Sequence, residues 1–152
     1  MKKLREIMRP DFLFSVKLDT RVIDAARLMA EKNIGIVAVL DGDRLAGVFS
    51  ERDLLNRVVA RGLDPARTPI AEVMTADIVV AGADDDYPTA MRKMDQRNIR
   101  HLPVVENGRV LSMVSIRDLM RAALDDAGAE IESLHAYLYQ VPPGVSASGG
   151  AA

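Results

Sequence analysis

The chain carries the same segment twice, 65 positions apart, within its 152 residues. Aligning Val22–Leu55 with Tyr87–Met120 gives eleven identical residues, where unrelated segments of ordinary composition would share about two. A copy of about sixty residues buries too little apolar surface to be stable alone. The duplication therefore predicts two similar units that pack against each other.

Each copy shows the pattern of a helix, two short strands and a second helix. The first helix of the first copy has Thr20 as its expected N-cap, with apolar residues at helical spacing at Val22, Ala25 and Met29. The equivalent helix begins near Tyr87, and the later helices begin at Ser50 and Ser115. The expected strands are residues 34–40 and 45–49, then 99–105 and 110–114.

This order predicts an α/β fold of two tandem β-α-β-β-α repeats, packed sheet to sheet about a pseudo-twofold axis with two equivalent clefts. We expect the first repeat at residues 1–60, a linker at 61–69 and the second repeat at 70–124. A C-terminal helix is expected at 125–140 and a disordered tail at 141–152.

Composition excludes several classes of protein. A net charge of -2 and few aromatic residues argue against a nucleic-acid-binding regulator. The absence of Cys excludes disulfides and thiolate metal sites, and two His without metal-site spacing predict no metal. The charged start does not resemble a signal peptide, and the apolar runs are too short to span a membrane, so we expect a cytoplasmic protein.

A Ser-x-x-Asp motif opens the helix after the last strand of each copy, as Ser50…Asp53 and Ser115…Asp118. The helix start favours a phosphate, and an Asp on the first turn can accept hydrogen bonds from ribose hydroxyls. The same motif also serves as a simple helix cap, so both interpretations stand for one copy. Its recurrence at the same point of a repeat favours a binding role.

The motif, following Ile-Arg-His-Leu-Pro-Val-Val in the second copy, resembles the CBS (cystathionine beta-synthase) domain pair of the stand-alone bacterial type. The resemblance covers about residues 7–124. It implies a regulatory module that binds AMP, ADP, ATP, NAD(H) or S-adenosylmethionine in one or both clefts.

The resemblance also implies roles for individual residues. Asp118 would hold the ribose and Ser115, Arg100 and His101 the phosphate, while the base would lie against Thr20, Ala25, Ile34 and Gly35. The mirror cleft would use Ser50, Arg52 and Asp53. Because Gly35 and Ile36 stand there in place of Arg100 and His101, we expect that cleft to bind phosphate less well.

No catalytic motif is present, so the sequence predicts a non-enzymatic sensor of an adenine nucleotide. The alternative is a structural dimerisation module whose clefts are degenerate. A homodimer is expected because helix faces such as Val22–Ala26–Met29 and Leu54–Leu55–Val58 would otherwise stay uncovered. The stripe Ile131, Leu134 and Leu138 either joins that dimer or packs back on its own module.

Overall fold

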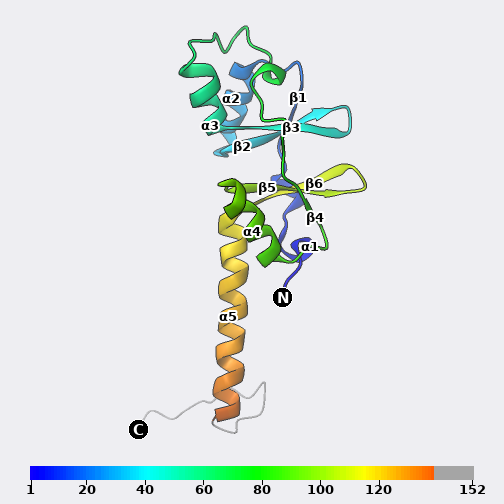
Figure 1. Ribbon diagram of the computed structural model, residues 1–152, viewed down its shortest axis with the longest axis vertical. Coiled ribbons are helices and arrows are strands. Elements are labelled where there is room, and N and C mark those ends of the chain that lie inside the picture. Colours follow the sequence, from blue (N-terminus) through cyan, green and yellow to red (C-terminus); the bar gives the residue numbers. More distant parts are fainter. Residues whose placement is uncertain (139–152) are drawn as a thin grey trace.

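Two three-stranded sheets, one from each repeat, lie next to each other at the centre of the molecule (Figure 1), a computed structural model that describes residues 1–138. The first sheet contains β1 (Ser15–Lys17), β2 (Ile36–Asp41) and β3 (Arg44–Ser50). The second contains β4 (Ala81–Gly82), β5 (His101–Glu106) and β6 (Arg109–Ser115). In both, the middle strand pairs parallel to the first and antiparallel to the third. The predicted α/β repeat fold is confirmed, and the predicted tail lies outside the described residues.

One helix precedes the middle strand of each sheet, α2 (Val22–Lys32) and α4 (Tyr87–Arg97). Both end at an asparagine in the left-handed region, Asn33 at φ 53° and Asn98 at φ 52°. Asparagine adopts that conformation more easily than other non-glycine residues. The prediction that Thr20 caps α2 was wrong. Arg21 is the N-cap residue, and Thr20 Oγ1 instead accepts a hydrogen bond of 3.0 Å from the Lys17 amide, which closes the preceding turn.

The helices that follow the third strands differ in length. α3 (Glu51–Asp53) continues as the π-helix η2 (Leu54–Val59), and a turn with Gly62 at φ +68° follows it. α5 (Ile116–Leu138) is one unbroken helix, so the expected boundary at Leu124 between two helices was wrong. No proline interrupts residues 116–138, and Gly128 stays helical. None of the helices within residues 1–138 is long and apolar enough to cross a membrane.

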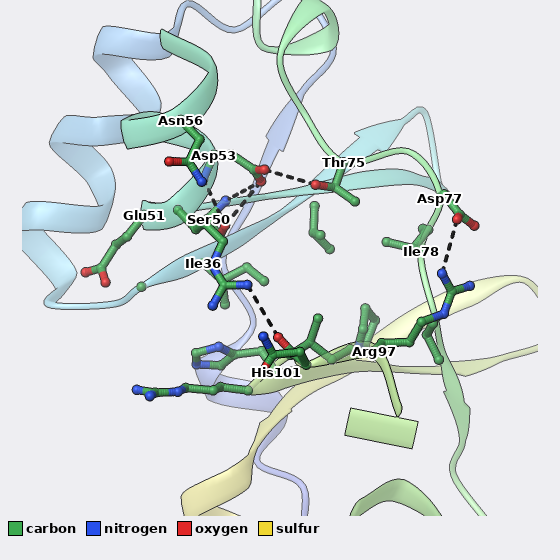
Figure 2. Close-up of a pocket in the computed structure, with 18 of the residues that line it drawn as sticks. Ile36, Ser50, Glu51, Asp53, Asn56, Thr75, Asp77, Ile78, Arg97 and His101 are labelled. Carbon is green, nitrogen blue, oxygen red and sulfur yellow. Dashed lines mark hydrogen bonds and ion pairs between the residues drawn. The ribbon is translucent and has the colours of Figure 1, made fainter. Parts of the chain in front are cut away.

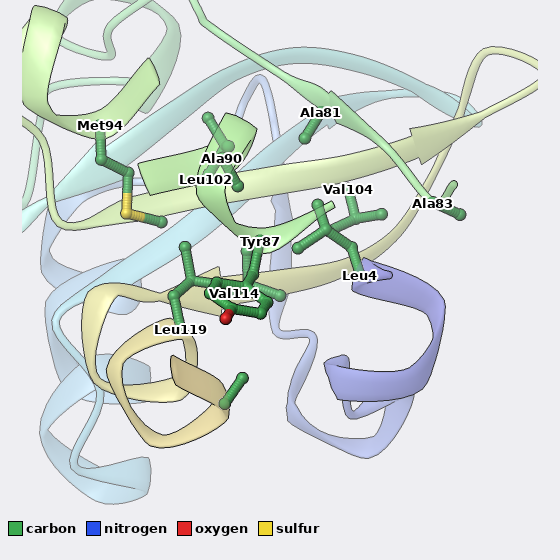
Figure 3. Packing of buried hydrophobic residues seen from close by; sticks show 11 residues of the cluster. Leu4, Ala81, Ala83, Tyr87, Ala90, Met94, Leu102, Val104, Val114 and Leu119 are labelled. Carbon is green, nitrogen blue, oxygen red and sulfur yellow. The ribbon is translucent and has the colours of Figure 1, made fainter. Parts of the chain in front are cut away.

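Each hydrophobic core is completed by the opening segment of the other repeat. The short helix α1 (Leu4–Ile7) inserts fully buried Leu4 into the second core, which Tyr87 and Leu119 also help to form (Figure 3). The 3₁₀ helix η3 (Ile70–Glu72) inserts fully buried Ile70 into the first core. A second 3₁₀ helix, η1 (Pro10–Phe12), connects α1 to β1. The two repeats therefore exchange short segments, and each segment supplies a buried residue to the core of the other repeat.

This packing buries part of the two helix faces that we expected to be exposed in a single module. Val22, Met29 and Val58 are buried in the first core, so the prediction that they face outward was wrong. Leu55 remains exposed.

Candidate functional site

A cleft of about 720 Å³ lies between the two repeats, large enough for a small-molecule ligand. Three stretches line it: the β2, β3 and α3 region of the first repeat, the segment before β4, and the turn that leads into β5. Its lining residues are Gly35, Ile36, Val48, Ser50, Glu51, Arg52, Asp53, Asn56, Arg57, Thr75, Asp77, Ile78, Val79, Arg97, Asn98, Ile99, Arg100, His101 and Pro103.

The Ser50–Asp53 pair forms a reciprocal helix cap on one wall of this cleft (Figure 2). Asp53 Oδ2 accepts hydrogen bonds from the Ser50 amide at 3.0 Å and the Ser50 hydroxyl at 3.2 Å. Its other oxygen, Oδ1, accepts from the Thr75 hydroxyl at 3.0 Å and lies 3.6 Å from Arg57 Nε. Asp53 is only 7 % exposed, and its charge is compensated by these partners.

Ser115 and Asp118 repeat the cap at the start of α5, without counterparts of the two further partners of Asp53, Thr75 and Arg57. Asp118 Oδ2 accepts from the Ser115 amide at 2.9 Å and the Ser115 hydroxyl at 3.0 Å. Within residues 1–138, Asp118 Oδ1 accepts no hydrogen bond. The carboxylate is half-buried, so this oxygen can accept a hydrogen from a ligand or from water.

Four arginines reach the cleft, and they differ in how far their donors are engaged. Arg57 donates to the Met74 carbonyl at 2.6 Å, and Arg97 pairs with Asp77 at 3.3 Å. Arg52 makes one long hydrogen bond of 3.4 Å to the Asn98 carbonyl. The side chain of exposed Arg100 makes no hydrogen bond or ion pair with any described residue. Its five N–H donors are therefore available to an anion in the cleft.

His101 begins β5 beside Arg100, opposite Ser115 in the strand register, and lies below the Ser50–Asp53 cap in Figure 2. Burial lowers the pKa of His101 below its usual value of 6.5, and the charge of Arg100 lowers it further. Asp118 and Glu51 act in the opposite direction. The net effect favours a neutral imidazole near pH 7, with one donor and one acceptor nitrogen.

Apolar side chains form the remaining walls. Ile36 and Ile78 lie on the two sides of the cleft in Figure 2, and Val48, Val79 and Ile99 add to the apolar lining. The cleft thus combines a slot for a flat apolar group with polar groups at its rim.

The structure brings together six of the residues singled out from the sequence, but not in the expected grouping. Arg100 and His101 line the same cleft as Gly35, Ser50, Arg52 and Asp53. The sequence placed both with Ser115 and Asp118. The structure pairs His101 with Ser115 in the strand register, and Asp118 is near enough to raise the pKa of His101, but neither Ser115 nor Asp118 lines this cleft. Ala25 is fully buried in the first core, half-buried Ile34 packs against that core, and Thr20 lies in the turn after β1.

Sequence reasoning missed the segment from Thr75 to Val79, together with Asn56, Arg57 and Arg97. The apolar run Ile78–Val79–Val80 after Asp77 could have identified this segment, because a short apolar run that follows a turn predicts a segment leading into a buried strand. Among the described residues, no group of three or more His, Asp or Glu could hold a metal ion.

The fold and the cleft define a class of protein: paired repeats with a ligand-sized cleft between them. Residues 4–60 and 70–125 each match the CBS domain family, so the chain belongs to that family as a tandem CBS pair.

Solved structures agree with this assignment. A protein with CBS domains from Burkholderia ambifaria is similar at 33% identity and a TM-score of 0.77, with 82% of this chain and 96% of that chain covered. The CBS domain pair of protein MJ0100, in complex with 5'-methylthioadenosine and S-adenosyl-L-methionine, is 23% identical with a TM-score of 0.72, over 80% of this chain and 98% of that chain. At that identity the second similarity shows the fold alone.

Among characterised sequences, the mitochondrial CBS domain-containing protein CBSX3 of Arabidopsis thaliana is 32% identical over 125 residues, which cover 79% of this chain. The match spans 61% of CBSX3 and 20% of a second Arabidopsis relative, CBSCBSPB2. These relatives are therefore longer than the part they share with this chain.

Proposed function

We propose that this CBS pair is a non-enzymatic regulatory module that binds an adenine nucleotide in the cleft between its repeats. The observation that carries the proposal is the unpaired guanidinium of Arg100 beside the Ser50–Asp53 cap, within one cleft. An arginine with free donors at the rim of a cleft suits a phosphate group. Free AMP, ATP and NAD(H) all carry the required chemistry.

The proposed pose follows from the walls of the cleft. The adenine ring lies between the apolar side chains of Ile36 and Ile78, and the ribose hydroxyls donate to the Asp53 carboxylate. The Thr75 hydroxyl holds one oxygen of that carboxylate, so a ribose hydroxyl takes its place or shares the oxygen. The phosphate faces Arg100 and His101. Two of the carboxylates in the cleft are engaged structurally, Asp53 as a helix cap and Asp77 in a pair with Arg97, which supports a binding role for the cleft rather than a catalytic one.

The adenosine compounds held by MJ0100 belong to that protein. They share with the proposed ligand a purine and a ribose, the two parts that the apolar slot and Asp53 would hold here. The choice among AMP, ATP and NAD(H) rests on titration.

The test is calorimetric titration with AMP and with adenosine, after a thermal-shift screen against AMP, ADP, ATP, NAD(H) and S-adenosylmethionine. Arg100→Ala should weaken AMP binding about ten- to a hundredfold, because a hydrogen bond to a charged group is worth roughly 1.5–3 kcal/mol. It should leave adenosine binding unchanged. Arg44→Ala, on an exposed strand end outside the cleft, is the matched control for losing one positive charge.

The alternative is a structural module with degenerate clefts, and one observation favours it. Asp53 is buried, and both of its oxygens are already engaged within the protein, as expected for a residue that only stabilises the helix start. No thermal shift with any of the five compounds at millimolar concentration would support this alternative and rule out the nucleotide sensor.

A further inference from the structure

We propose that α5 pairs with α5 of a second copy of this chain as a parallel two-stranded coiled coil. In Figure 1, α5 extends well beyond the second repeat. Near the second repeat, Asp125 of α5 pairs with Lys2 at 3.4 Å, and Asp126 accepts a hydrogen bond from Tyr87. The following twelve residues, 127–138, are about 18 Å of helix at 1.5 Å per residue.

The apolar residues of α5 follow the spacing of a coiled-coil seam. One set of them, apart from the residues that face the second core, recurs at alternating intervals of four and three residues, at Met120, Leu124, Ala127, Ile131, Leu134 and Leu138. This spacing of 3.5 residues matches the a and d positions of a heptad and keeps one seam facing one partner helix. A helix that packs on a globular body usually has a wider apolar face.

The seam is uncovered and carries no charge. Leu124 is 71 % exposed, Ile131 is 58 % exposed and Leu134 is 55 % exposed. The packing of this stripe on its own module, which the sequence left open, is therefore not what the structure shows. Asp125, Asp126 and Glu132 fall at b or c positions, outside the seam, where they would stay in water.

The equivalent helix of the first repeat favours a parallel arrangement. A shift of 65 residues places Leu55 on Met120 and Val59 on Leu124, and all four side chains are exposed. The helices that carry them lie along the same side of the molecule in Figure 1. A parallel pair brings the second body to the same end, so that Leu55 and Val59 meet their own counterparts. An antiparallel pair would leave both in water.

Helix stability also favours a partner. Most helix stability in proteins comes from packing of an apolar face, and the apolar residues Ile131, Leu134 and Leu138 are exposed. Gly128 also lowers the helix propensity of this part of α5 by about 1 kcal/mol relative to alanine. Packing against a second copy would supply the missing stabilisation. An alanine at the d position 127, followed by Gly128, allows close approach of the two backbones.

Single-cysteine cross-linking tests the proposal, because the natural chain has no Cys. Ala127→Cys and Leu134→Cys place a thiol at two different d positions. Ala129→Cys places it on the opposite face of the same helix and is the matched control. In a parallel pair each d residue faces its own copy, within the Cα separation of about 4.4–6.8 Å that a disulfide needs.

We expect both d-position variants to form covalent dimers under mild oxidation at least about tenfold faster than the Ala129→Cys control, because only they meet the disulfide distance. Circular dichroism confirms that each variant is folded, and sedimentation of the natural chain should give a dimer. Rates equal to that of the control would overturn the pairing. Cross-linking by only one of the two variants would overturn the parallel direction, since an antiparallel pair brings at most one position onto its own copy. A monomer in sedimentation would also reject the proposal.

Discussion

Two aspartates in equivalent positions have different surroundings, and the difference sets what each contributes to stability. Asp53 holds the Ser50 amide and hydroxyl, the Thr75 hydroxyl and Arg57, whereas Asp118 holds Ser115 alone. Removing a helix cap costs about 1 kcal/mol. A buried polar group left without its partner adds about 1–3 kcal/mol.

We therefore expect Asp53→Ala to lower the free energy of unfolding by about 2–4 kcal/mol and Asp118→Ala by about 1 kcal/mol. Urea denaturation of the two variants measures this difference. Thr75→Val is a useful third variant, because it removes only the hydroxyl that donates to Asp53. Equal losses in the two aspartate variants would show that the contact with Thr75 contributes nothing.

His101 is the second residue whose surroundings predict a measurement. Burial places the pKa of this side chain below 6.5 in the folded protein, while the unfolded chain keeps a pKa near 6.5. The unfolded state then binds more protons than the folded state between the two values. The contribution of His101 to stability is therefore complete above pH 6.5 and declines as the pH falls toward the folded-state pKa.

The expected result is a midpoint below pH 6.5 for the His101 ring in an NMR titration of the ligand-free protein. His101→Gln should remove the corresponding part of the pH dependence of unfolding. A phosphate bound beside the ring should raise this pKa, because a nearby negative charge favours the protonated form. A midpoint at or above 6.5 without ligand would contradict the prediction.

At the scale of elements, the third strand of each repeat contacts a segment near the start of the other repeat, and the two contacts differ. Gly47 in β3 lies against the Thr75 carbonyl, and a Cβ at position 47 would be only 2.6 Å from that oxygen. The equivalent residue in β6 is Ser112, whose hydroxyl donates to the Arg9 carbonyl at 3.0 Å. The glycine permits a close backbone approach, and the serine replaces it with a side-chain hydrogen bond.

Gly47→Ala should lower the free energy of unfolding by about 1–3 kcal/mol, since the backbone must move to admit the methyl group. Ser112→Ala should cost about 1 kcal/mol, from a single lost hydrogen bond. Thermal and urea unfolding measure both. If Gly47→Ala were neutral, the approach of β3 to Thr75 would have to be looser than the structure indicates.

The elements themselves could be predicted from the sequence to within a few residues. Val22, Ala25 and Met29 identified α2, and Ser50 and Ser115 marked the starts of α3 and α5 correctly. The strand expected from Ile34 begins at Ile36, because Asn33 takes a left-handed conformation and Ile34 lies in the turn that follows. An apolar residue in a turn cannot be told from one in a strand by its side chain alone, so the sequence could not predict the first residue of the strand.

The residues that line the cleft were only partly predictable from the sequence. The repeated Ser-x-x-Asp motif pointed to Ser50 and Asp53, the family resemblance pointed to Arg100 and His101, and all four line one cleft. Which helix start faces which strand end depends on how the two sheets are stacked, and residue patterns within one element do not report that. The segment around Ile78 carries an apolar run, but no pattern within that segment shows that it lines the cleft.

At the scale of the whole molecule, the exchanged segments make the two repeats depend on each other. Leu4 opens the first repeat but fills the second core, and Ile70 opens the second repeat but fills the first. Each lies in a short stretch with few other apolar residues, Ile7 and Met8 after Leu4 and Val73 and Met74 after Ile70, so the sequence did not mark the stretch as core of the other repeat. Neither repeat has a complete core without the other half of the chain.

Truncation of Leu4 should therefore weaken mainly the second repeat, and truncation of Ile70 mainly the first. Leu4→Ala removes a fully buried side chain and should cost about 2–5 kcal/mol, with the loss centred on the second core. In native-state hydrogen exchange, the amides of β5 and α4 should lose more protection than those of β2 and α2. Ile70→Ala should show the reverse pattern, since its neighbours are Val37 and Phe49 of the first core.

Phe12→Ala is the control, because Phe12 is exposed in the segment between α1 and β1 and belongs to neither core. It should leave the protection of both repeats nearly unchanged. Loss confined to β1–β3 in Leu4→Ala would contradict the exchange of segments. Equal loss of protection in both repeats would show instead that contacts between the repeats couple the two cores into one cooperative unit. A ligand bound between the repeats would then add little to that coupling.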